Sequence, residues 1–300
     1  MDKTLFDFHA DDFAVSLSAS QDISRLGEKG AIDSISIIPN MSAFAQSVSL
    51  LKSFPPEVKR SIHLNFMEGR SCLPKEKVSE LVDYRGCFKI SWGSLLLSCF
   101  KRSKRVTLKT QLAEEIVAQV EKCIATGVVD PEALRLDSHQ HTHMIPLVQE
   151  ALFEAIDRLE EQGRKVVFVR NTQDLLSIYF GTKGGLKEFS FANMLKCLIL
   201  NWFSIALRRR LKERNLPIGY LCGVFYSGHM DDERLKKVLP AFEKLAIKKK
   251  CKVEVLFHPG SVKKEEITPK FNKPGFVNFH LSKNRHIEFN TLCNLSGVRV

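Results

Sequence analysis

Short apolar segments alternate with longer segments of helical periodicity along most of this chain. Residues 32–38 and 165–170 are rich in β-branched side chains, which predicts buried strands. In residues 110–126, apolar side chains recur every three or four positions before Gly127, which predicts a helix and its end. By the same criteria we expect further strands at residues 5–8, 60–66, 134–146, 221–226 and 252–257, and further helices at residues 16–28, 41–52, 146–163, 189–211 and 231–249.

The alternation amounts to about seven strand-and-helix units without an internal repeat. Regular alternation implies parallel strands that are covered by helices. We therefore expect an α/β fold of the (β/α) barrel-like type, regular or distorted, with an active site at the C-terminal ends of its strands. An open doubly wound sheet is the alternative, and it would bring fewer strand ends together. We expect one domain over residues 1–300, with residues 67–107, a candidate lid, and residues 186–215 as variable excursions.

The amino-acid composition indicates the cellular compartment of the protein and the kind of partner that it can bind. Eight cysteines occur without a Cys-x-x-Cys pair or regular spacing, so neither a zinc knuckle nor a disulfide framework is indicated. The first residues lack the features of a signal peptide, and we expect a cytoplasmic protein. The formal charge of +11 favours anionic partners at long range. Its basic runs at residues 101–109, 208–214 and 244–252 are typical of solvated surfaces, and no nucleic-acid partner is expected.

The most apolar segment is residues 189–211, which ends in the cluster Arg208-Arg209-Arg210. Asn193, Lys196 and Asn201 interrupt it, so the uninterrupted apolar run is too short to span a bilayer. We expect a core helix. The alternative is a helix that lies on an anionic membrane surface, and the region near Trp202 is also a candidate interface for a homo-oligomer.

Polar side chains are concentrated in the predicted strand at residues 134–146. Asp137, His139, His141 and His143 occupy every second position, and a strand points every second side chain to the same face. One face would then carry a carboxylate and three imidazoles, which indicates a metal site. The alternative is a hydrogen-bonded surface strand with structural histidines.

Other reactive side chains lie in or just after predicted strands. Adjacent residues of an extended chain point to opposite sides, so Asp11 and Asp12 can serve two purposes, one as a metal ligand and one as a base. Asp12, His63 and one histidine of residues 139–143 would form a ligand set with open positions, as in hydrolytic metal sites. His258 could then protonate a leaving amine. Taken singly, the Asp pair is compatible with a helix cap or turn and each histidine with a structural role.

Four motifs occur in a fixed order, and together they resemble the YdjC-like (ChbG) carbohydrate deacetylases from about Leu5 to Gly260. The tail, with Arg285 and Glu288, fits this family more loosely. The motifs are His9-Ala-Asp-Asp-Phe13, Ile62-His-Leu-Asn65 followed by Glu68-Gly69, Leu136-Asp-Ser-His-Gln-His-Thr-His143, and Phe257-His-Pro-Gly260.

The resemblance implies an enzyme with a β/α-barrel-like fold that removes acetyl groups from N-acetylated sugars, typically N-acetylglucosamine units. By motif position, Asp11 would be the general base and His258 the general acid, and the ligands of a divalent metal would be Asp12, His63 and His139. Magnesium is the usual ion of the family, but two imidazoles suit zinc or another transition metal better. Further residues expected to contact the substrate or to orient these groups are His9, Asp137, His141, His143 and Arg170.

Two residues depart from the family pattern. His9 stands where the family usually has Asn, so it could support the site from behind the ligands or compete for the metal. Ala14 stands where the family usually has Gly, and it would be strained if that position takes a positive φ. Two other functions stay open from the sequence: another metal-dependent hydrolase, such as a phosphoesterase or a cyclic amidase, and a non-catalytic basic binding protein.

Overall fold

A computed structural model describes residues 2–100, 102–186, 189–267 and 274–299. Seven parallel strands form one sheet in the order β5-β4-β3-β2-β1-β7-β6. The sheet is curled into a half-barrel, and within the described residues its edge strands β5 and β6 each pair with one neighbour only. The strands are β1 (Phe6–Phe13), β2 (Ser34–Ile37), β3 (Lys59–Leu64), β4 (Leu134–Ser138), β5 (Val166–Val169), β6 (Tyr220–Cys222) and β7 (Val253–Phe257).

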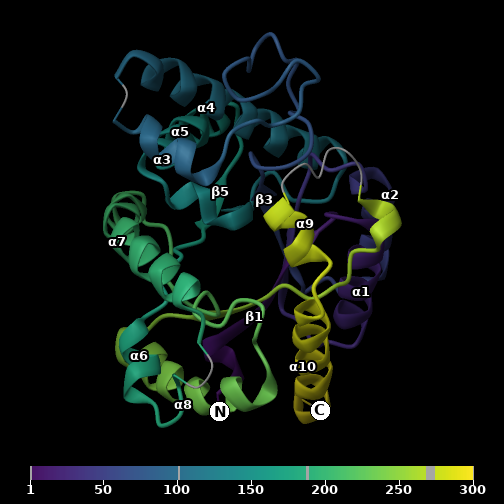
Figure 1. The fold of residues 1–300 in the computed structure, drawn as a ribbon, viewed down its shortest axis with the longest axis vertical. Coiled ribbons are helices and arrows are strands. Elements are labelled where there is room, and N and C mark those ends of the chain that lie inside the picture. The colour runs from purple at the N-terminus through teal and green to yellow at the C-terminus, as the bar shows by residue number, and fades with distance from the viewer. Residues whose placement is uncertain (1, 101, 187–188, 268–273, 300) are drawn as a thin grey trace.

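Helices surround the strands on the outside, and the first strand β1 begins at the same lower side of the view as the C-terminal helix (Figure 1). The α-helices are α1 (Leu17–Glu28), α2 (Phe44–Val48), α3 (Trp92–Ser98), α4 (Arg102–Ala125), α5 (Pro146–Glu161), α6 (Leu176–Gly181), α7 (Phe191–Glu213), α8 (Asp232–Lys249), α9 (Pro274–His280) and α10 (Asn284–Arg299). Four short 3-10 segments complete the described elements: Lys3–Leu5, Ser49–Ser53, His139–Met144 and Lys264–Glu266.

The local sequence explains where several elements begin. Ser16 accepts a hydrogen bond from the backbone of Ala19 and begins α1, and Asp231 does the same for Arg234 at the start of α8. Pro146 occupies the first turn of α5, where its missing N–H costs no hydrogen bond. Strand β1 is buried over its whole length because helices and neighbouring strands cover both faces of the parallel sheet. The predicted (β/α) barrel-like fold with about seven parallel strands is therefore confirmed.

Several boundaries differ from those that the sequence predicts. The strand expected at residues 134–146 ends at Ser138, because Gln140 and His141 adopt left-handed backbone angles with φ values of 55° and 56°. The helix expected at 110–126 begins at Arg102, which shortens the excursion expected at 67–107. Lys101, in the first basic run, lies outside the described residues. The strand expected at 221–226 is limited to Tyr220–Cys222.

The expectation of a core helix at residues 189–211 is only half right. One face of α7 is buried, but the opposite face exposes large apolar side chains. The part of the chain that the structure describes contains no helix that combines the length and the apolar character needed to cross a bilayer.

Candidate active site

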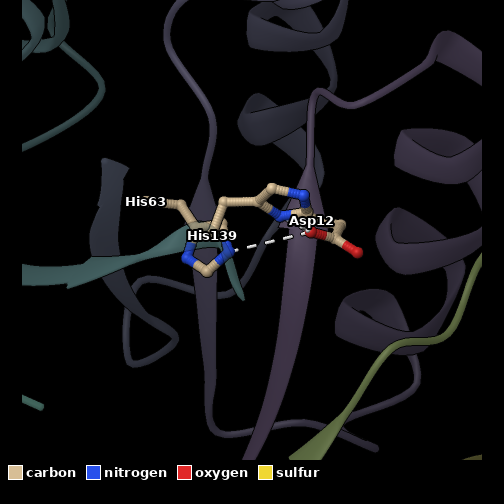
Figure 2. A group of neighbouring side chains, drawn as sticks. All are labelled: Asp12, His63 and His139. Atoms are coloured by element: carbon tan, nitrogen blue, oxygen red, sulfur yellow. Dashed lines mark hydrogen bonds and ion pairs between the residues drawn. The ribbon is translucent and has the colours of Figure 1, made fainter. Parts of the chain in front are cut away.

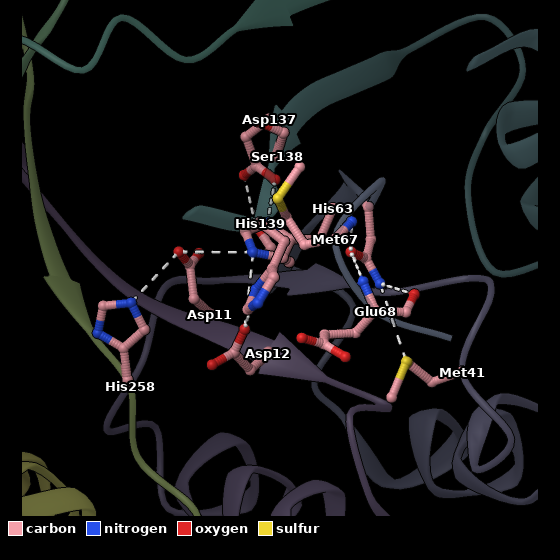
Figure 3. A network of polar contacts seen from close by, with 12 residues as sticks. Asp11, Asp12, Met41, His63, Met67, Glu68, Asp137, Ser138, His139 and His258 are labelled. Carbon is pink, nitrogen blue, oxygen red and sulfur yellow. Dashed lines mark hydrogen bonds and ion pairs between the residues drawn. The ribbon is translucent and has the colours of Figure 1, made fainter. Parts of the chain in front are cut away.

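The reactive residues meet at the C-terminal ends of four strands that are near neighbours in the sheet (Figure 3). Asp11 and Asp12 end β1, His63 lies in β3, and His139 and His258 directly follow β4 and β7. All five line one pocket of about 680 Å³. The sequence-based expectation that strand ends gather these side chains is therefore correct in its geometry.

The two aspartates reach the same pocket because β1 is irregular at its end. Adjacent side chains of a regular strand point to opposite faces. Asp12, however, has a φ of 69°, and the pairing of β1 with β2 changes register between Ala10 and Phe13. This local bulge turns both carboxylates toward the pocket, where a regular strand would have separated them.

Asp12, His63 and His139 form the inner group of the site (Figure 2). Nδ1 of His139 lies 3.0 Å from Oδ1 of Asp12, and Nε2 of His63 lies 3.7 Å from the same oxygen. One donor atom from each residue lies within 4.8 Å of the others, and all three side chains are buried. A carboxylate and two imidazoles at this spacing are a suitable donor set for a divalent cation, so the residues fit the metal that the sequence predicts.

Both aspartates are held in the charged form despite complete burial. Burial alone would raise the pKa of Asp12, but His139 and the Arg285 guanidinium, 3.0 Å away, hold that pKa well below its usual value. For Asp11, burial is again opposed, here chiefly by Arg170, and the pKa also lies well below the usual value. Both groups are therefore carboxylates at neutral pH, available as ligand or proton acceptor.

Arg170 directly follows β5, and its buried guanidinium contacts the acidic residues of the site. Its Nη1 and Nη2 donate to the two carboxylate oxygens of Asp11 at 3.1 and 2.9 Å. Nη2 also lies 3.0 Å from Oδ2 of Asp137 and 2.5 Å from Oε1 of Glu254. A single guanidinium thus contacts three buried carboxyl groups, and it fixes the orientation of Asp11 through a bidentate contact.

Asp137 orients His63 from the neighbouring strand. His63 and Asp137 are paired in the β3–β4 register, and Nδ1 of His63 lies 2.6 Å from Oδ1 of Asp137. Because an ionised carboxylate only accepts, Nδ1 carries the hydrogen and Nε2 is left facing the pocket. Burial lowers the pKa of His63, but Asp11 and Asp137 outweigh it and raise the pKa above the usual value.

The three histidines of residues 139–143 are not equivalent, because the chain turns after Ser138. His143 is directed away from the pocket: its Nε2 lies 2.9 Å from the carbonyl of Arg170 and its Nδ1 lies 2.6 Å from the Ser138 hydroxyl. His141 lines the pocket, and burial followed by the charge of Lys196 holds its pKa well below the usual value. The idea of three imidazoles on one strand face is therefore wrong.

His9 lies behind the ligands, inside β1. Its ring nitrogens contact the hydroxyls of Ser34 at 2.6 Å and Ser36 at 2.7 Å, and Nε2 lies 3.1 Å from Asp11. His9, Asp11 and Asp137 also have the spacing of a metal-binding group. The Arg170 guanidinium already contacts both of these carboxylates, so a cation occupies that position and a second metal is not needed there.

Three residues that the sequence analysis did not assign to the site complete it. Arg285 and Glu288, three positions apart on α10, share one helix face. Arg285 contacts Asp12, and Glu288 accepts from the backbone N–H of His258 at 2.5 Å and lies 3.7 Å from its Nδ1. Lys196 of α7 lines the pocket opposite the strand ends. The loose match of the tail to the family was the available signal for Arg285 and Glu288. For Lys196 the signal was its charge within the most apolar segment of the chain.

Ala14 adopts a φ of 71°, so the residue that replaces the family's glycine is in the left-handed region. A non-glycine residue in this region costs about 1 to 2 kcal/mol. Among residues with a β-carbon, alanine has the smallest side chain. The Ala14 amide donates a hydrogen bond to the Ser20 hydroxyl at 2.9 Å, which holds the turn in place.

Comparisons with known proteins give the family of the chain and a structure of similar fold. A sequence model of the family described as YdjC-like protein matches residues 7–296. A carbohydrate deacetylase of Thermoanaerobacter pseudethanolicus is 29% identical over 146 residues, which are 49% of this chain and 54% of the relative. A carbohydrate deacetylase of Vibrio campbellii is 26% identical over 157 residues, which are 52% and 55% of the two chains. The match thus spans about half the length of these curated relatives.

A solved structure shares the fold. The crystal structure of a protein from Enterococcus faecalis V583, provisionally called a cellobiose-phosphate cleavage protein, superposes with a TM-score of 0.57. The superposition covers 97% of this chain and 94% of that protein at 16% sequence identity. At this identity the likeness supports the half-barrel fold alone.

Proposed function

Because the chain belongs to the YdjC-like protein family, we propose that it is a metal-dependent carbohydrate deacetylase, which removes the acetyl group from N-acetylated sugars of the N-acetylglucosamine type. The observation that carries the proposal is the convergence of Asp12, His63 and His139 with Asp11 and His258 in one pocket. Two relatives that carry the name carbohydrate deacetylase support it.

In this proposal Asp12, His63 and His139 hold a divalent cation. Such a cation supplies Lewis-acid chemistry, which favours ionisation of water and polarises the acetyl carbonyl. The donor set of one oxygen and two nitrogens favours zinc or another transition metal over the magnesium that the family resemblance implies. Metal analysis of the purified protein would decide between these ions.

Asp11 is the proposed general base. The guanidinium of Arg170 holds both of its oxygens and keeps the carboxylate ionised, so Asp11 is ready to accept the proton of the attacking water. Because that contact also fixes the plane of the carboxylate, the Asp11 side chain loses little conformational freedom when the substrate binds.

His258 is the proposed general acid. Its Nε2 lies 3.9 Å from Oδ2 of Asp11, and Glu288 holds the other side of the residue. Cleavage of the amide C–N bond leaves an amine that must gain a proton, and a histidine at the pocket wall supplies one.

We also propose a cellular compartment and a domain organisation for the enzyme. Within the part of the chain that the structure describes, no disulfide joins any of the eight cysteines, which agrees with a reducing cytoplasm. We propose that residues 1–300 act as one catalytic domain whose partner is the N-acetylated carbohydrate.

Acetate release from N-acetylated mono- and oligosaccharides tests this function. We expect activity that a chelator abolishes and an added divalent cation restores. Asp11→Asn and His139→Ala should each lower kcat/KM by about 100-fold or more, because they remove the base or a ligand. The exposed substitutions Asp157→Asn and His286→Ala are matched controls and should leave it unchanged.

Full activity of Asp11→Asn or of His139→Ala would contradict the proposal. Release of phosphate from phosphate esters without acetate release would instead select a phosphoesterase on the same residues.

A further inference from the structure

The outer face of α7 carries a continuous row of exposed apolar side chains. The residues recur at intervals of four and three positions, which places them along one line of the helix surface. Their exposed fractions lie between 48% and 69%. The row consists of Phe191, Leu195, Leu198, Trp202 and Ile205. The opposite face is buried against the core through Cys197, Leu200, Phe203, Leu207 and Leu211.

Neighbouring elements extend this apolar surface. Trp92 at the start of α3 stacks on Phe203 of α7, with ring centroids 6.3 Å apart, and α6 packs against α7. Leu97 and Phe100 at the end of α3 and Phe180 of α6 are largely exposed. Helices α3, α7 and α6 follow one another along one side of the molecule (Figure 1). A row of exposed apolar side chains on one helix, with further exposed apolar residues on the neighbouring helices, is characteristic of a docking surface.

The charges of α7 distinguish between the partners that could cover this row. The helix contains five basic residues and one acidic residue, and the line of the row continues into the exposed Arg209 and Lys212. A second copy would bring the same excess of positive charge, so two α7 helices offer each other no charge complementarity. An anionic bilayer attracts the basic residues and accepts the apolar row at the same time.

We infer that α7 is a membrane-docking helix, which lies in the headgroup region of an anionic bilayer with its row of apolar residues inserted. Trp202, in the middle of the row, suits this region because an indole combines an apolar ring with a polar N–H. Lys212 would then contact lipid phosphate and favour anionic lipid by about fivefold. Arg209 would do so by exchanging its exposed ion pair with Glu213, 3.1 Å away, for a lipid phosphate. Arg208 contributes less, because it donates to Gln173 at 2.8 Å and stacks over Tyr220.

Docking would place the mouth of the active-site pocket at the bilayer surface. Leu195 belongs both to the exposed row and to the pocket lining, and Ala192, Lys196 and Ile199 of the same helix also line the pocket. The inference does not depend on the reaction that the pocket performs, so it can be tested without a substrate.

Vesicle sedimentation of the full chain tests it. One set of vesicles contains phosphatidylcholine alone, and the other contains phosphatidylcholine with roughly one third phosphatidylglycerol, which supplies the negative surface potential that attracts basic segments. We expect binding to the anionic vesicles that weakens as salt is added. The double variant Leu198→Glu/Trp202→Glu should bind about tenfold or more weakly, because it places two carboxylates among the headgroups. Trp202 fluorescence should shift to shorter wavelength with anionic vesicles, and Trp202→Phe should remove that shift.

The matched control is Ile247→Glu, which changes an equally exposed apolar residue on α8 and should bind as the unchanged protein does. Circular dichroism shows whether each variant is folded. Failure of the unchanged protein to bind anionic vesicles, equal binding to both vesicle types, or equal binding by the double variant and the control would overturn the inference. A dimer in solution that the double variant converts to a monomer, without vesicle binding, would show that a second copy covers α7.

Discussion

At the scale of single residues, Arg170 is the cation on which the site depends. It is fully buried and contacts Asp11, Asp137 and Glu254, whose carboxylates would otherwise repel one another in a medium of low polarity. Replacing Arg170 with Gln leaves three buried carboxylates without their shared counter-charge. We expect the free energy of unfolding at pH 7 to fall by about 3 to 5 kcal/mol, measured by urea denaturation.

The matched control for Arg170 is Arg25→Gln. Arg25 is exposed and pairs with Asp22 on the surface of α1, so its loss should change the free energy of unfolding by less than about 1 kcal/mol. Lowering the pH should partly restore the Arg170→Gln variant relative to the unchanged protein, because protonation relieves its buried carboxylates. Equal stability of the two variants would show that the Arg170 network does not hold the site together.

At the scale of elements, the sequence predicted which strands carry the reactive residues. It did not predict the backbone conformation at the C-terminal ends of these strands. Alternating Asp and His at 137–143 fit a strand, and only the structure shows the turn after Ser138. Periodicity cannot reveal this turn, because the left-handed angles of Gln140 and His141 are set by contacts from elsewhere, such as the bond of His143 to the Arg170 carbonyl. The bulge at Asp12 escaped prediction for the same reason.

The C-terminal helix illustrates a second limit. Arg285 and Glu288 lie far in sequence from the motifs, and their spacing of three positions shows only that they share a helix face. That this face meets Asp12 and His258 follows from the packing of α10 across the end of β1 and β7, which local sequence does not encode.

The segment between β3 and α4 is anchored by one buried carboxylate. Oε1 of Glu115 in α4 accepts from the backbone N–H of Cys72 at 2.8 Å, and Oε2 accepts from that of Leu73 at 3.1 Å. Glu115→Ala leaves both donors without an acceptor. We expect a loss of about 1 to 3 kcal/mol in the free energy of unfolding, with faster hydrogen exchange at the Cys72 and Leu73 amides.

Glu114→Ala is the control for this prediction, since it changes the same residue type one position earlier on α4. Glu114 is only partly buried, so its replacement should leave exchange in the 70–73 segment unchanged. Unchanged exchange at Cys72 and Leu73 in Glu115→Ala would mean that other contacts hold the segment to α4.

At the scale of the whole molecule, the buried histidines set how stability depends on pH. Burial is the main cause that lowers the pKa of His139, His141, His143 and His280 below 6.5, and for His143 the pKa falls to about 4. A group with a lowered folded-state pKa binds fewer protons in the folded protein than in the unfolded chain. Its contribution to stability is therefore complete above pH 6.5 and is lost as the pH falls toward the folded-state pKa.

Asp174 and His63 act in the opposite direction. Burial raises the pKa of Asp174 to about 6, so the folded protein gains stability from this group as the pH falls from 6 toward 3.8. The gain is about 3 kcal/mol, similar to the loss from His143 alone. The pKa of His63 is raised, which adds some stability at low pH. Burial also raises the pKa of Glu115 and of Glu254, which act in the same direction as Asp174. We expect the histidines to dominate, because the pKa values of His141, His143 and His280 lie furthest from their usual value.

We therefore expect the free energy of unfolding of the metal-free protein to fall between pH 6.5 and pH 4, measured by urea denaturation in the presence of a chelator. His143→Gln should be less stable at pH 7, because it loses the bonds to Ser138 and to the Arg170 carbonyl. It should also show a smaller decline toward pH 4, by about 3 kcal/mol, since the unfolded chain no longer has this group to protonate. His286→Ala, an exposed position, should keep the full decline. If His143→Gln declines as steeply as His286→Ala, the pH dependence arises from groups other than the neutral imidazole buried behind the site.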